Sequence, residues 1–304
     1  MRQWRFIAVI LGMALVVLFG VRFLVPKGGK GFFQGGQKKL YEEAKESFSR
    51  GNNDEALRLY TQLATRNPSS DLVDEGYLGI GDVQFEKENL LEARGAYEKI
   101  VRDFPNSNSA ALVQDRLGKV NIAALFSPIA TPADKTVQVQ PGETLAKIAK
   151  AQGTTVDLLI RSNHLKSDLI RPGMKLKVPG ARFSIVIDKS QNTLALKAGE
   201  EIFKVYSVAT GAHNSTPVGN FKIVNKLVNP VWYTLGAVVP AESSENVLGT
   251  RWLGIDVPGY GIHGTKDPSS IGKQGTQGCV RMFNGDVEEI YAIVPIGTEI
   301  TIID

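Results

Sequence analysis

The strongest constraint on the fold is a change of hydrophobic period partway along the chain. From residue 182 to residue 304, apolar and polar residues alternate in short runs (FSIVIDK, NTLALKA, IFKVYSV, FKIVNKL and TEITIID). Turn residues separate these runs at intervals of roughly 8 to 12 positions, a spacing typical of sandwiches and open barrels. Between residues 38 and 126, small and aromatic residues instead recur at helical spacing. The chain of 304 residues therefore holds an all-α part and a mainly β part.

The helical part contains an internal repeat. Three residues return after a displacement of 37 positions: Ala56, Tyr60 and Pro68 recur as Ala93, Tyr97 and Pro105. A fixed period of this size is typical of stacked helical pairs. The runs EALRLYTQLATRNP and EARGAYEKIVRDFP resemble the second helices and closing prolines of tetratricopeptide repeats. This resemblance implies a surface for a protein partner, or a spacer, over residues 38–126, and an ordinary helical bundle is the alternative.

The N-terminal residues predict a membrane anchor. The apolar run over residues 6–25 carries one charge, Arg22, which can extend to the membrane interface. About twenty helical residues at about 1.5 Å each span the hydrocarbon core of a bilayer. A cleaved signal peptide is the alternative, but the small-x-small cleavage pattern is missing just after the run. We therefore expect a transmembrane helix over residues 1–25 and a flexible glycine-rich linker over residues 26–37.

Charge and cysteine content exclude several classes of function. The chain has 35 basic and 31 acidic residues, but seven of the basic ones lie within residues 1–39, which hold no acid. The rest of the chain is net acidic by three charges, so we expect no nucleic-acid partner. The single cysteine, Cys279, excludes an intrachain disulfide and a cysteine-built zinc site. We expect neither a metal nor another cofactor.

A compact unit of strand, helix, helix and strand is predicted over residues 136–179. Alternating valines begin it, Pro141-Gly142 forms a turn, Thr144 caps a first helix, and Gly153 ends that helix. The run GETL, a central Asn-x-Leu and the closing IRPGMKLKVP resemble the lysin motif (LysM).

The LysM resemblance implies a βααβ fold that binds glycans containing N-acetylglucosamine, chiefly peptidoglycan and chitin. The implied groove lies between the first strand–helix turn and the loop before the last strand. The residues carried over to this groove are Gly142, Glu143, Thr144, Leu145, Ile170, Arg171 and Pro172. Turn and cap chemistry is the alternative role for the same residues.

One cluster in the β part combines a thiol, an imidazole and several glycines, in the runs YGIHGT and TQGCVRM. Cys279 is a candidate nucleophile, and His263 can accept its proton and lower its pKa. Backbone N–H groups beside the cysteine can stabilise an oxyanion. In an extended segment Arg281 lies on the same side as Cys279, where it can hold a carboxylate. A buried cysteine unrelated to the histidine is the alternative.

The HGT run followed by TQGCVRM resembles the signature of the L,D-transpeptidase catalytic domain. Further runs of that domain follow in order: STPVGNFKI, NPVW, NVLGTRW and VPIGT. The resemblance covers residues 182–304 and implies Cys279 as nucleophile, His263 as base, and the Gly264 carbonyl as the group that orients the imidazole. The oxyanion hole and substrate contacts it implies involve Thr276, Gln277, Gly278, the Cys279 amide and Arg281.

Two positions depart from the family pattern. Gln277 stands where many members have a second histidine, and Val247 stands where proline is frequent. If position 277 acts through its backbone amide alone, the first change costs little, whereas a side-chain role would alter the rate or the choice of acceptor. The two other histidines, His164 and His213, are expected to be exposed to solvent.

The expected function is that of a membrane-tethered, multidomain cell-wall enzyme with its catalytic domain outside the cytoplasm. The thiolate attacks the carbonyl of the third, L-centred residue of a peptidoglycan stem, releases terminal D-alanine and forms a thioester. Another stem, water or a protein lysine then resolves the thioester, which gives a cross-link, trimming or protein attachment. A non-catalytic wall-binding scaffold is the alternative, and the joint presence of His263, Gly264, Cys279 and Arg281 argues against it.

Overall fold

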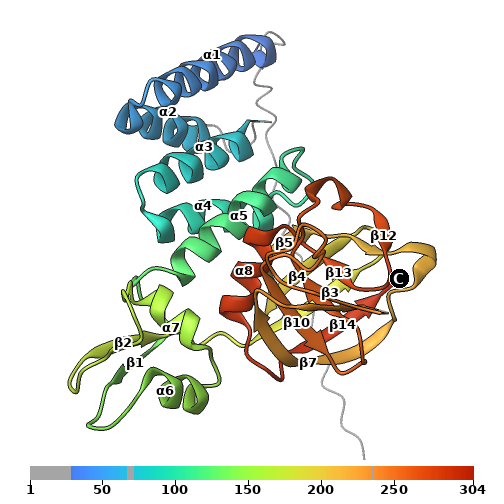
Figure 1. Ribbon diagram of the computed structural model, residues 1–304. Helices are drawn as coiled ribbons and strands as arrows, with labels where there is room; N and C mark the ends of the chain where they lie inside the picture. The colour runs from blue at the N-terminus through green and yellow to red at the C-terminus, as the bar shows by residue number, and fades with distance from the viewer. Residues whose placement is uncertain (1–28, 67–71, 235) are drawn as a thin grey trace, which may run out of the picture.

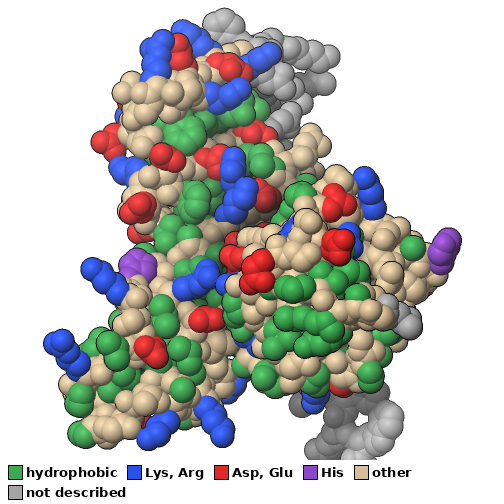
Figure 2. Space-filling model, in the orientation of Figure 1, with side chains coloured by type: hydrophobic (Ala, Val, Ile, Leu, Met, Phe, Trp, Pro, Cys, Tyr) green, Lys and Arg blue, Asp and Glu red, His purple; other side chains and the backbone are tan. Residues whose placement is uncertain are grey.

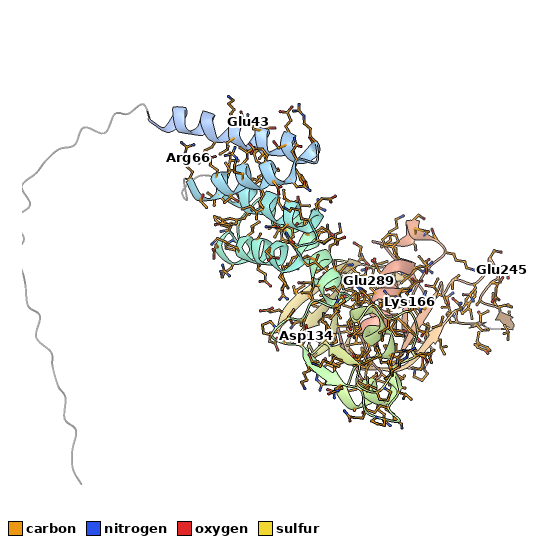
Figure 3. The ribbon with its side chains drawn as sticks, turned by 90° about the vertical axis from the view of Figure 1, so that its left-hand side faces the viewer. Glu43, Arg66, Asp134, Lys166, Glu245 and Glu289 are labelled. Atoms are coloured by element: carbon orange, nitrogen blue, oxygen red, sulfur yellow. The ribbon has the colours of Figure 1, made fainter. Side chains whose placement is uncertain are left out.

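The computed structural model describes residues 29–66, 72–234 and 236–304. Figure 1 shows three parts in chain order: a stack of helices, a small α/β unit, and a β-rich C-terminal domain. In Figure 3 the helical stack extends away from the β-rich domain, with Glu43 near its far end and Glu245 on the opposite side of the molecule. On the face shown in Figure 2, acidic and basic side chains intermix over the helices instead of gathering by sign.

The first part is all-α, as predicted. Its helices pack in sequence, each against the next. They are α1 (Gly29–Ser49), α2 (Asn53–Arg66), α3 (Val73–Glu86), α4 (Leu90–Asp103) and α5 (Ala110–Leu125). Helix α1 begins inside the segment that was expected to be a flexible linker, residues 26–37, so that segment is helical from Gly29 onward.

Packing explains why a tyrosine recurs after 37 residues. Tyr60 of α2 and Tyr97 of α4 are both buried, and each ring lies against a glycine of α3. A Cβ atom added at Gly79 would lie 2.3 Å from the Tyr60 ring, and one added at Gly81 would lie 2.4 Å from the Tyr97 ring. Each repeat therefore pairs a large aromatic residue with a position that has no room for a side chain. Pro68, the third recurring residue, lies outside the described residues.

The second part has the predicted strand–helix–helix–strand order. Its elements are β1 (Lys135–Gln138), α6 (Leu145–Gln152), α7 (Val156–Ser162) and β2 (Lys175–Val178), with β1 and β2 antiparallel. The Thr144 hydroxyl accepts a hydrogen bond from the Lys147 N–H and so caps α6. Gly153 ends that helix with a φ of +66°, a left-handed conformation that glycine adopts at little steric cost. Local sequence chemistry therefore accounts for the ends of α6.

The third part is mainly β, as predicted. Its longer strands are β3 (Phe183–Asp188), β4 (Thr193–Ala198), β5 (Glu201–Ser207), β7 (Gly219–Val228), β10 (Arg251–Ile255) and β14 (Glu299–Ile303). Its short strands are β6 (Thr210–Gly211), β8 (Trp232–Thr234), β9 (Ala237–Val239), β11 (Gly261–His263), β12 (Gln274–Thr276) and β13 (Val280–Arg281). Helix α8 (Asn284–Ile293) follows β13, and two 3₁₀ turns span Ala212–Asn214 and Pro268–Ser270.

Eight of these strands form one mixed sheet in the order β13-β11-β10-β7-β14-β3-β4-β5. Most neighbours are antiparallel, but β13 runs parallel to β11, and β14 runs parallel to β3. Strand β13 therefore lies at an edge of the sheet, beside the strand that carries His263. The two segments that the sequence singled out for chemistry meet at this edge.

The three parts share a hydrophobic core. Ile122 and Leu125 of α5 and Leu158 of α7 are buried in the same cluster as the inward side chains of the large sheet and α8. The Thr155 hydroxyl, just before α7, donates a hydrogen bond to the Ala292 carbonyl of α8. The small α/β unit is thus packed on the β-rich domain and is not a freely tethered module.

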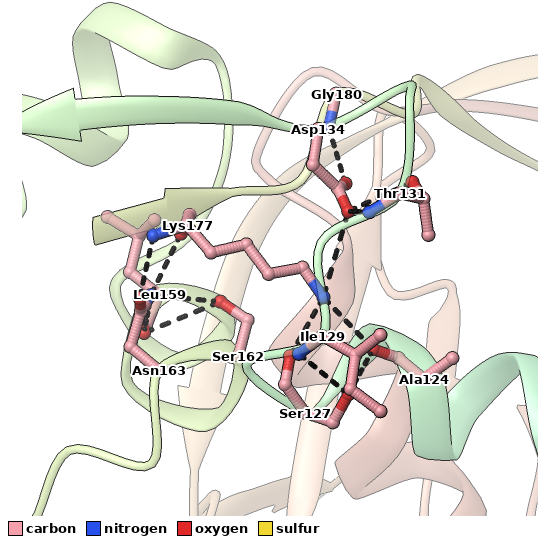
Figure 4. A network of polar contacts seen from close by, with 10 residues as sticks. All are labelled: Ala124, Ser127, Ile129, Thr131, Asp134, Leu159, Ser162, Asn163, Lys177 and Gly180. Carbon is pink, nitrogen blue, oxygen red and sulfur yellow. Dashed lines mark hydrogen bonds and ion pairs between the residues drawn. The ribbon is translucent and has the colours of Figure 1, made fainter. Parts of the chain in front are cut away.

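A buried lysine joins the small unit to the helices (Figure 4). The Nζ atom of Lys177, on β2, donates hydrogen bonds to the carbonyls of Ala124 at 3.0 Å and Ser127 at 2.8 Å. It also lies 3.8 Å from the Asp134 carboxylate. Burial lowers the pKa of Lys177, and the nearby carboxylate opposes that effect. The ammonium group therefore satisfies carbonyls at the end of α5, where a helix leaves them unpaired.

The membrane assignment needs correction. In the part of the chain that the structure describes, no helix combines the length and the apolar character needed to cross a bilayer. The apolar run over residues 6–25 falls outside the described residues. Among the described residues the fold comprises the helical, α/β and β-rich parts, and it supports neither the predicted transmembrane helix nor the predicted location in the cytoplasmic membrane.

Candidate active site

Parallel pairing brings the predicted site residues to one edge of the sheet. His263 on β11 and Arg281 on β13 are direct partners in the register, so their side chains lie on the same face. Cys279 directly precedes β13, and its sulfur contacts the backbone at the start of β11. The Cys279 Sγ donates a hydrogen bond to the Gly259 carbonyl at 3.5 Å and accepts one from the Gly261 N–H. A thiol, an imidazole and a guanidinium therefore gather at this edge.

His263 is almost fully buried, with 3% of its surface exposed. Its Nδ1 lies 2.7 Å from the Gly264 carbonyl oxygen. A carbonyl only accepts, so Nδ1 carries the proton and Nε2 presents a lone pair in the neutral ring. Burial lowers the pKa of His263 to about 4; the charge of Arg281 adds to this effect, and the carbonyls of Gly264 and Leu248 oppose it. The imidazole is therefore neutral near pH 7 and able to accept a proton.

The indole of Trp252 holds the plane of the imidazole. The two rings stack with their centroids 6.0 Å apart and their planes 18° apart. The Trp252 Nε1 in turn donates a hydrogen bond to the Asn225 side-chain oxygen at 3.0 Å. The sequence singled out Trp252 only as part of the NVLGTRW run, and no local signal pointed to Asn225.

Cys279 is half-buried, and this burial raises the pKa of its thiol above the usual value. The Gly261 N–H and the charge of Arg281 oppose the effect without reversing it. The sequence-based expectation of a thiolate near neutral pH is therefore not met in the free protein. The resting pair is a protonated thiol and a neutral imidazole.

A tight turn positions the cysteine. The Thr276 hydroxyl donates to the Cys279 carbonyl at 2.6 Å and accepts from the Gly278 N–H at 3.1 Å. Gly278 has a φ of +128°, and a Cβ atom there would lie 2.6 Å from the Tyr260 ring. Only glycine fits this position without strain. The Gly278 amide, one of the implied oxyanion donors, is thus engaged by Thr276 in this state.

Sequence analysis missed the role of Thr216 at this turn. The Thr216 hydroxyl donates to the Gly278 carbonyl at 2.9 Å and accepts from the Gly211 N–H at 2.8 Å. It thereby ties the cysteine turn to β6. The STPVG run that contains Thr216 was a family signal, but the run alone does not say which backbone groups the hydroxyl contacts.

A groove of about 290 Å³ is lined by two residues that contact the site residues, although Cys279 and His263 do not line it themselves. Gly259, whose carbonyl accepts the thiol hydrogen bond, and Trp252, which stacks on the histidine, both line it. Its other lining residues include Val224, Asp256 and Tyr260.

Beside the thiol, the Nε atom of the half-buried Arg281 has no hydrogen-bond partner within the described parts of the chain. An anionic group of a ligand can pair with this guanidinium.

The predicted glycan residues fall on two adjoining loops. The Gly173 N–H donates to the Val139 carbonyl at 2.8 Å, which joins the loop before β2 to the end of β1. The Glu143 carboxylate accepts from the Gln140 N–H at 2.7 Å, and Thr144 caps α6. Leu145 is 1% exposed and belongs to the core of the unit.

The remaining predicted glycan residues differ in exposure. Gly142, Arg171 and Pro172 are exposed, whereas Ile170 packs against the core of the unit. Both other histidines, His164 and His213, are exposed.

Comparison with known proteins matches three families in the predicted order. A sequence model of the L,D-transpeptidase catalytic domain (YkuD) matches residues 182–302, a LysM domain matches residues 137–179, and a tetratricopeptide repeat matches residues 75–107. The LysM and L,D-transpeptidase matches together indicate peptidoglycan binding.

Several curated proteins named as L,D-transpeptidases are similar to the chain. YkuD of Bacillus licheniformis is 37% identical over 173 residues, which cover 54% of this chain and 96% of that protein. YkuD of Bacillus subtilis is 33% identical over 174 residues, which cover 55% of this chain and 98% of that protein. A solved L,D-transpeptidase from Mycobacterium smegmatis superposes with a TM-score of 0.35 at 20% identity, covering 43% of this chain and 64% of that one.

The HGT and TQGCVRM runs that meet at the sheet edge lie inside the residues matched by the catalytic-domain family. Because the chain also covers nearly the whole length of a relative with 37% identity, it belongs to the L,D-transpeptidase family.

Proposed function

We propose that the chain is a cysteine-dependent peptidoglycan L,D-transpeptidase, with Cys279 as nucleophile and His263 as general base. The observation that carries the proposal is the pairing of β11 with β13, which gathers a thiol, a neutral imidazole and a guanidinium at one edge of the sheet. A neutral imidazole with Nδ1 protonated is the form that accepts a proton at Nε2.

During acyl transfer to the thiol, a proton moves first from Cys279 to His263 and then from His263 to the departing amine. His263 Nε2 takes the thiol proton as Sγ bonds to the carbonyl carbon of the third stem residue. When the carbon–nitrogen bond breaks, the imidazolium returns the proton to the departing amine of D-alanine. The product is a thioester on Cys279, and no oxidant, reductant or metal takes part.

The second half-reaction resolves the thioester. An acceptor amine attacks the carbonyl carbon, the carbon–sulfur bond breaks, and the amine proton passes through His263 to the sulfur. An amine of a neighbouring stem gives a cross-link between third residues, water gives L,D-carboxypeptidase activity, and a protein lysine gives protein attachment. Arg281 is proposed to hold a substrate carboxylate, because its positive charge lies on the same sheet face as His263 and acts on the pKa of the Cys279 thiol.

In this proposal the small α/β unit binds glycan and the helical repeats bind a protein partner. Glycan held by Gly142, Glu143, Thr144, Ile170, Arg171 and Pro172 raises the local concentration of stems near the thiol. Leu145 supports these loops from the core and is no longer proposed to contact glycan. The helical repeats are proposed as a surface for a protein partner.

Mass spectrometry of muropeptides tests the proposal. Purified protein is incubated with peptidoglycan that bears tetrapeptide stems, and we expect loss of D-alanine together with cross-linked or trimmed products. Cys279→Ala abolishes all of these products, whereas His164→Ala, a substitution at an exposed histidine, leaves them unchanged. An unaltered muropeptide profile with the wild-type protein contradicts the proposal and favours the wall-binding scaffold.

A further inference from the structure

One peptide bond joins the proposed base to a side chain on the next helix. The carbonyl of Gly264 accepts the hydrogen bond from His263 Nδ1 at 2.7 Å. The N–H of Thr265, which belongs to the same peptide bond, donates to the Asn284 Oδ1 at 3.0 Å. Because a peptide group is planar, the direction of its N–H also sets the direction of its C=O. The hydrogen bond at Asn284 therefore controls where the Gly264 carbonyl points.

Asn284 is itself held firmly. It is the first residue of α8, and its Oδ1 accepts a second hydrogen bond, from the Thr250 N–H at 3.2 Å. A Cβ atom added at Gly249 would lie 2.3 Å from this oxygen, and one added at Gly264 would lie 2.2 Å from it. Two glycine-containing segments therefore close around one amide oxygen, which has little room to move.

Further contacts of His263 are the stacked Trp252 and the carbonyl of Leu248. The stacked Trp252 fixes the plane of the ring, but a stacked ring does not favour one imidazole tautomer over the other. A carbonyl placed at Nδ1 does favour one, since it pairs only with a protonated nitrogen. The chain of contacts from Asn284 Oδ1 through the Gly264–Thr265 peptide thus acts on the nitrogen that carries the proton.

We propose that Asn284 is a positioning residue for the proposed base: through the Gly264–Thr265 peptide it holds His263 as the Nδ1–H tautomer and leaves Nε2 free for the thiol proton. The inference rests on the proposed function for the role of Nε2, but the position of the ring proton is a property of the folded protein. Hydrogen bonds in series also polarise one another, so the loss of one at Asn284 weakens the one at His263.

Two substitutions separate the acceptor oxygen from the rest of the side chain. Asn284→Ala removes the acceptor and leaves the Thr250 and Thr265 N–H groups unpaired. Asn284→Asp keeps an acceptor oxygen and adds a negative charge near the imidazole. The matched control is Asn163→Ala, because Asn163 also joins backbone segments, with its side chain bound to Leu159 and Lys177, but lies in the small α/β unit.

The first readout is the ¹⁵N NMR signal of the His263 ring, which reports the tautomer without any substrate. We expect the wild-type and Asn284→Asp proteins to show one protonated Nδ1 and a bare Nε2. In Asn284→Ala the two tautomers mix, while Asn163→Ala keeps the wild-type pattern. A wild-type tautomer pattern in folded Asn284→Ala overturns the inference.

The second readout is the rate of Cys279 acylation by a stem peptide as a function of pH. We expect Asn284→Ala to slow acylation by roughly 10- to 100-fold with little change in KM, comparable to the effect of removing the hydrogen bond that supports a metal-binding histidine. In Asn284→Asp the rate is largely kept, and its acid limb moves up by about one pH unit because the added charge favours the imidazolium. An acid limb at the same pH in Asn284→Asp and wild type contradicts the inference.

Absence of acylation in the wild type contradicts the proposed function instead, and the NMR result then still decides the role of Asn284.

Discussion

Burial shifts the pKa values of His263 and Cys279 in opposite directions, because it disfavours the charged form of each group. It removes charge from the imidazole of His263, whose pKa falls to about 4, and from the thiolate of Cys279, whose pKa rises. Both groups are therefore neutral at pH 7, and in the proposed reaction the proton moves from sulfur to nitrogen only as the sulfur attacks. Such a pair differs from a preformed thiolate–imidazolium ion pair, in which the nucleophile is charged before substrate arrives.

The neutral pair predicts an alkylation profile for Cys279, the only thiol of the chain. Because the thiolate is the reactive form, the rate with iodoacetamide falls about tenfold for each pH unit below the thiol pKa. We expect the rate to keep rising through pH 9, as followed by mass spectrometry. A rate that is flat from pH 6 to pH 9 would show that the thiolate already exists at neutral pH and contradict the assignment.

The lowered pKa of His263 also predicts that the fold loses stability in acid. Its pKa of about 4 in the folded protein lies below the ordinary value of about 6.5 in the unfolded chain. The unfolded chain therefore binds the proton first, so stability is lost as the pH falls from 6.5 to 4 and does not change through this group above 6.5. The whole interval is worth about 3 kcal/mol.

Urea unfolding at pH 4.5 and pH 7 measures this effect. His263→Gln is expected to reduce the difference between the two pH values by most of that amount, whereas His164→Gln, at an exposed site, leaves it unchanged. Equal pH dependence in wild-type and His263→Gln proteins contradicts the prediction.

At the scale of elements, the turn between β12 and β13 combines a conformational requirement with two side-chain hydrogen bonds. Gly278 supplies the positive φ, and Thr276 spans the turn from the Gly278 N–H to the Cys279 carbonyl. The turn is further anchored by Thr216. The position of the sulfur therefore depends on hydroxyl groups that do not themselves react.

Thr276→Val keeps the shape of the side chain and removes both hydrogen bonds. We expect the free energy of unfolding to fall by about 1 to 3 kcal/mol, since a buried N–H loses its partner, and the acylation rate to fall as the sulfur loses its position. Thr276→Ser keeps the hydroxyl and serves as the control, with near wild-type values in urea unfolding and acylation assays. The prediction fails if valine and serine behave alike.

At the scale of the whole molecule, the parts matched by separate families are joined by shared packing. Leu158 of the LysM unit is buried in the catalytic-domain cluster, and Lys177 binds carbonyls of the helical region. The distance between the proposed glycan-binding loops and the thiol is therefore set by the fold. Deleting the LysM unit would uncover part of the core of the catalytic domain, so the proposed glycan docking and the proposed chemistry are coupled through stability.

Lys177→Met tests this coupling because it keeps the apolar stem and removes the ammonium. Two buried carbonyls and the Asp134 carboxylate lose a partner, and we expect the free energy of unfolding to fall by about 3 kcal/mol. Lys175→Met, at the exposed start of the same strand, is the control and changes little. Urea unfolding that gives equal values for both variants would show that the parts are energetically independent.

Local chemistry determined much of this protein from the sequence alone. Helix α6 begins at a threonine cap and ends at a glycine because both signals act within a few residues. Alternation predicted the β-rich domain, and the thirty-seven-residue recurrence predicted stacked helices. The roles of Cys279 and His263 were predicted from the resemblance of the HGT and TQGCVRM runs to the L,D-transpeptidase signature, and they remain predictions.

Tertiary structure alone decided what depends on distant residues. The directions of the pKa shifts follow from desolvation by the whole fold, which no local pattern contains. The contacts of Trp252, Thr216 and Asn284 join segments far apart in the chain, as does the burial of Leu158 against the catalytic domain. Short-range sterics and hydrogen bonds set the elements, whereas packing between elements set the proton positions and the rigidity on which the proposed chemistry depends.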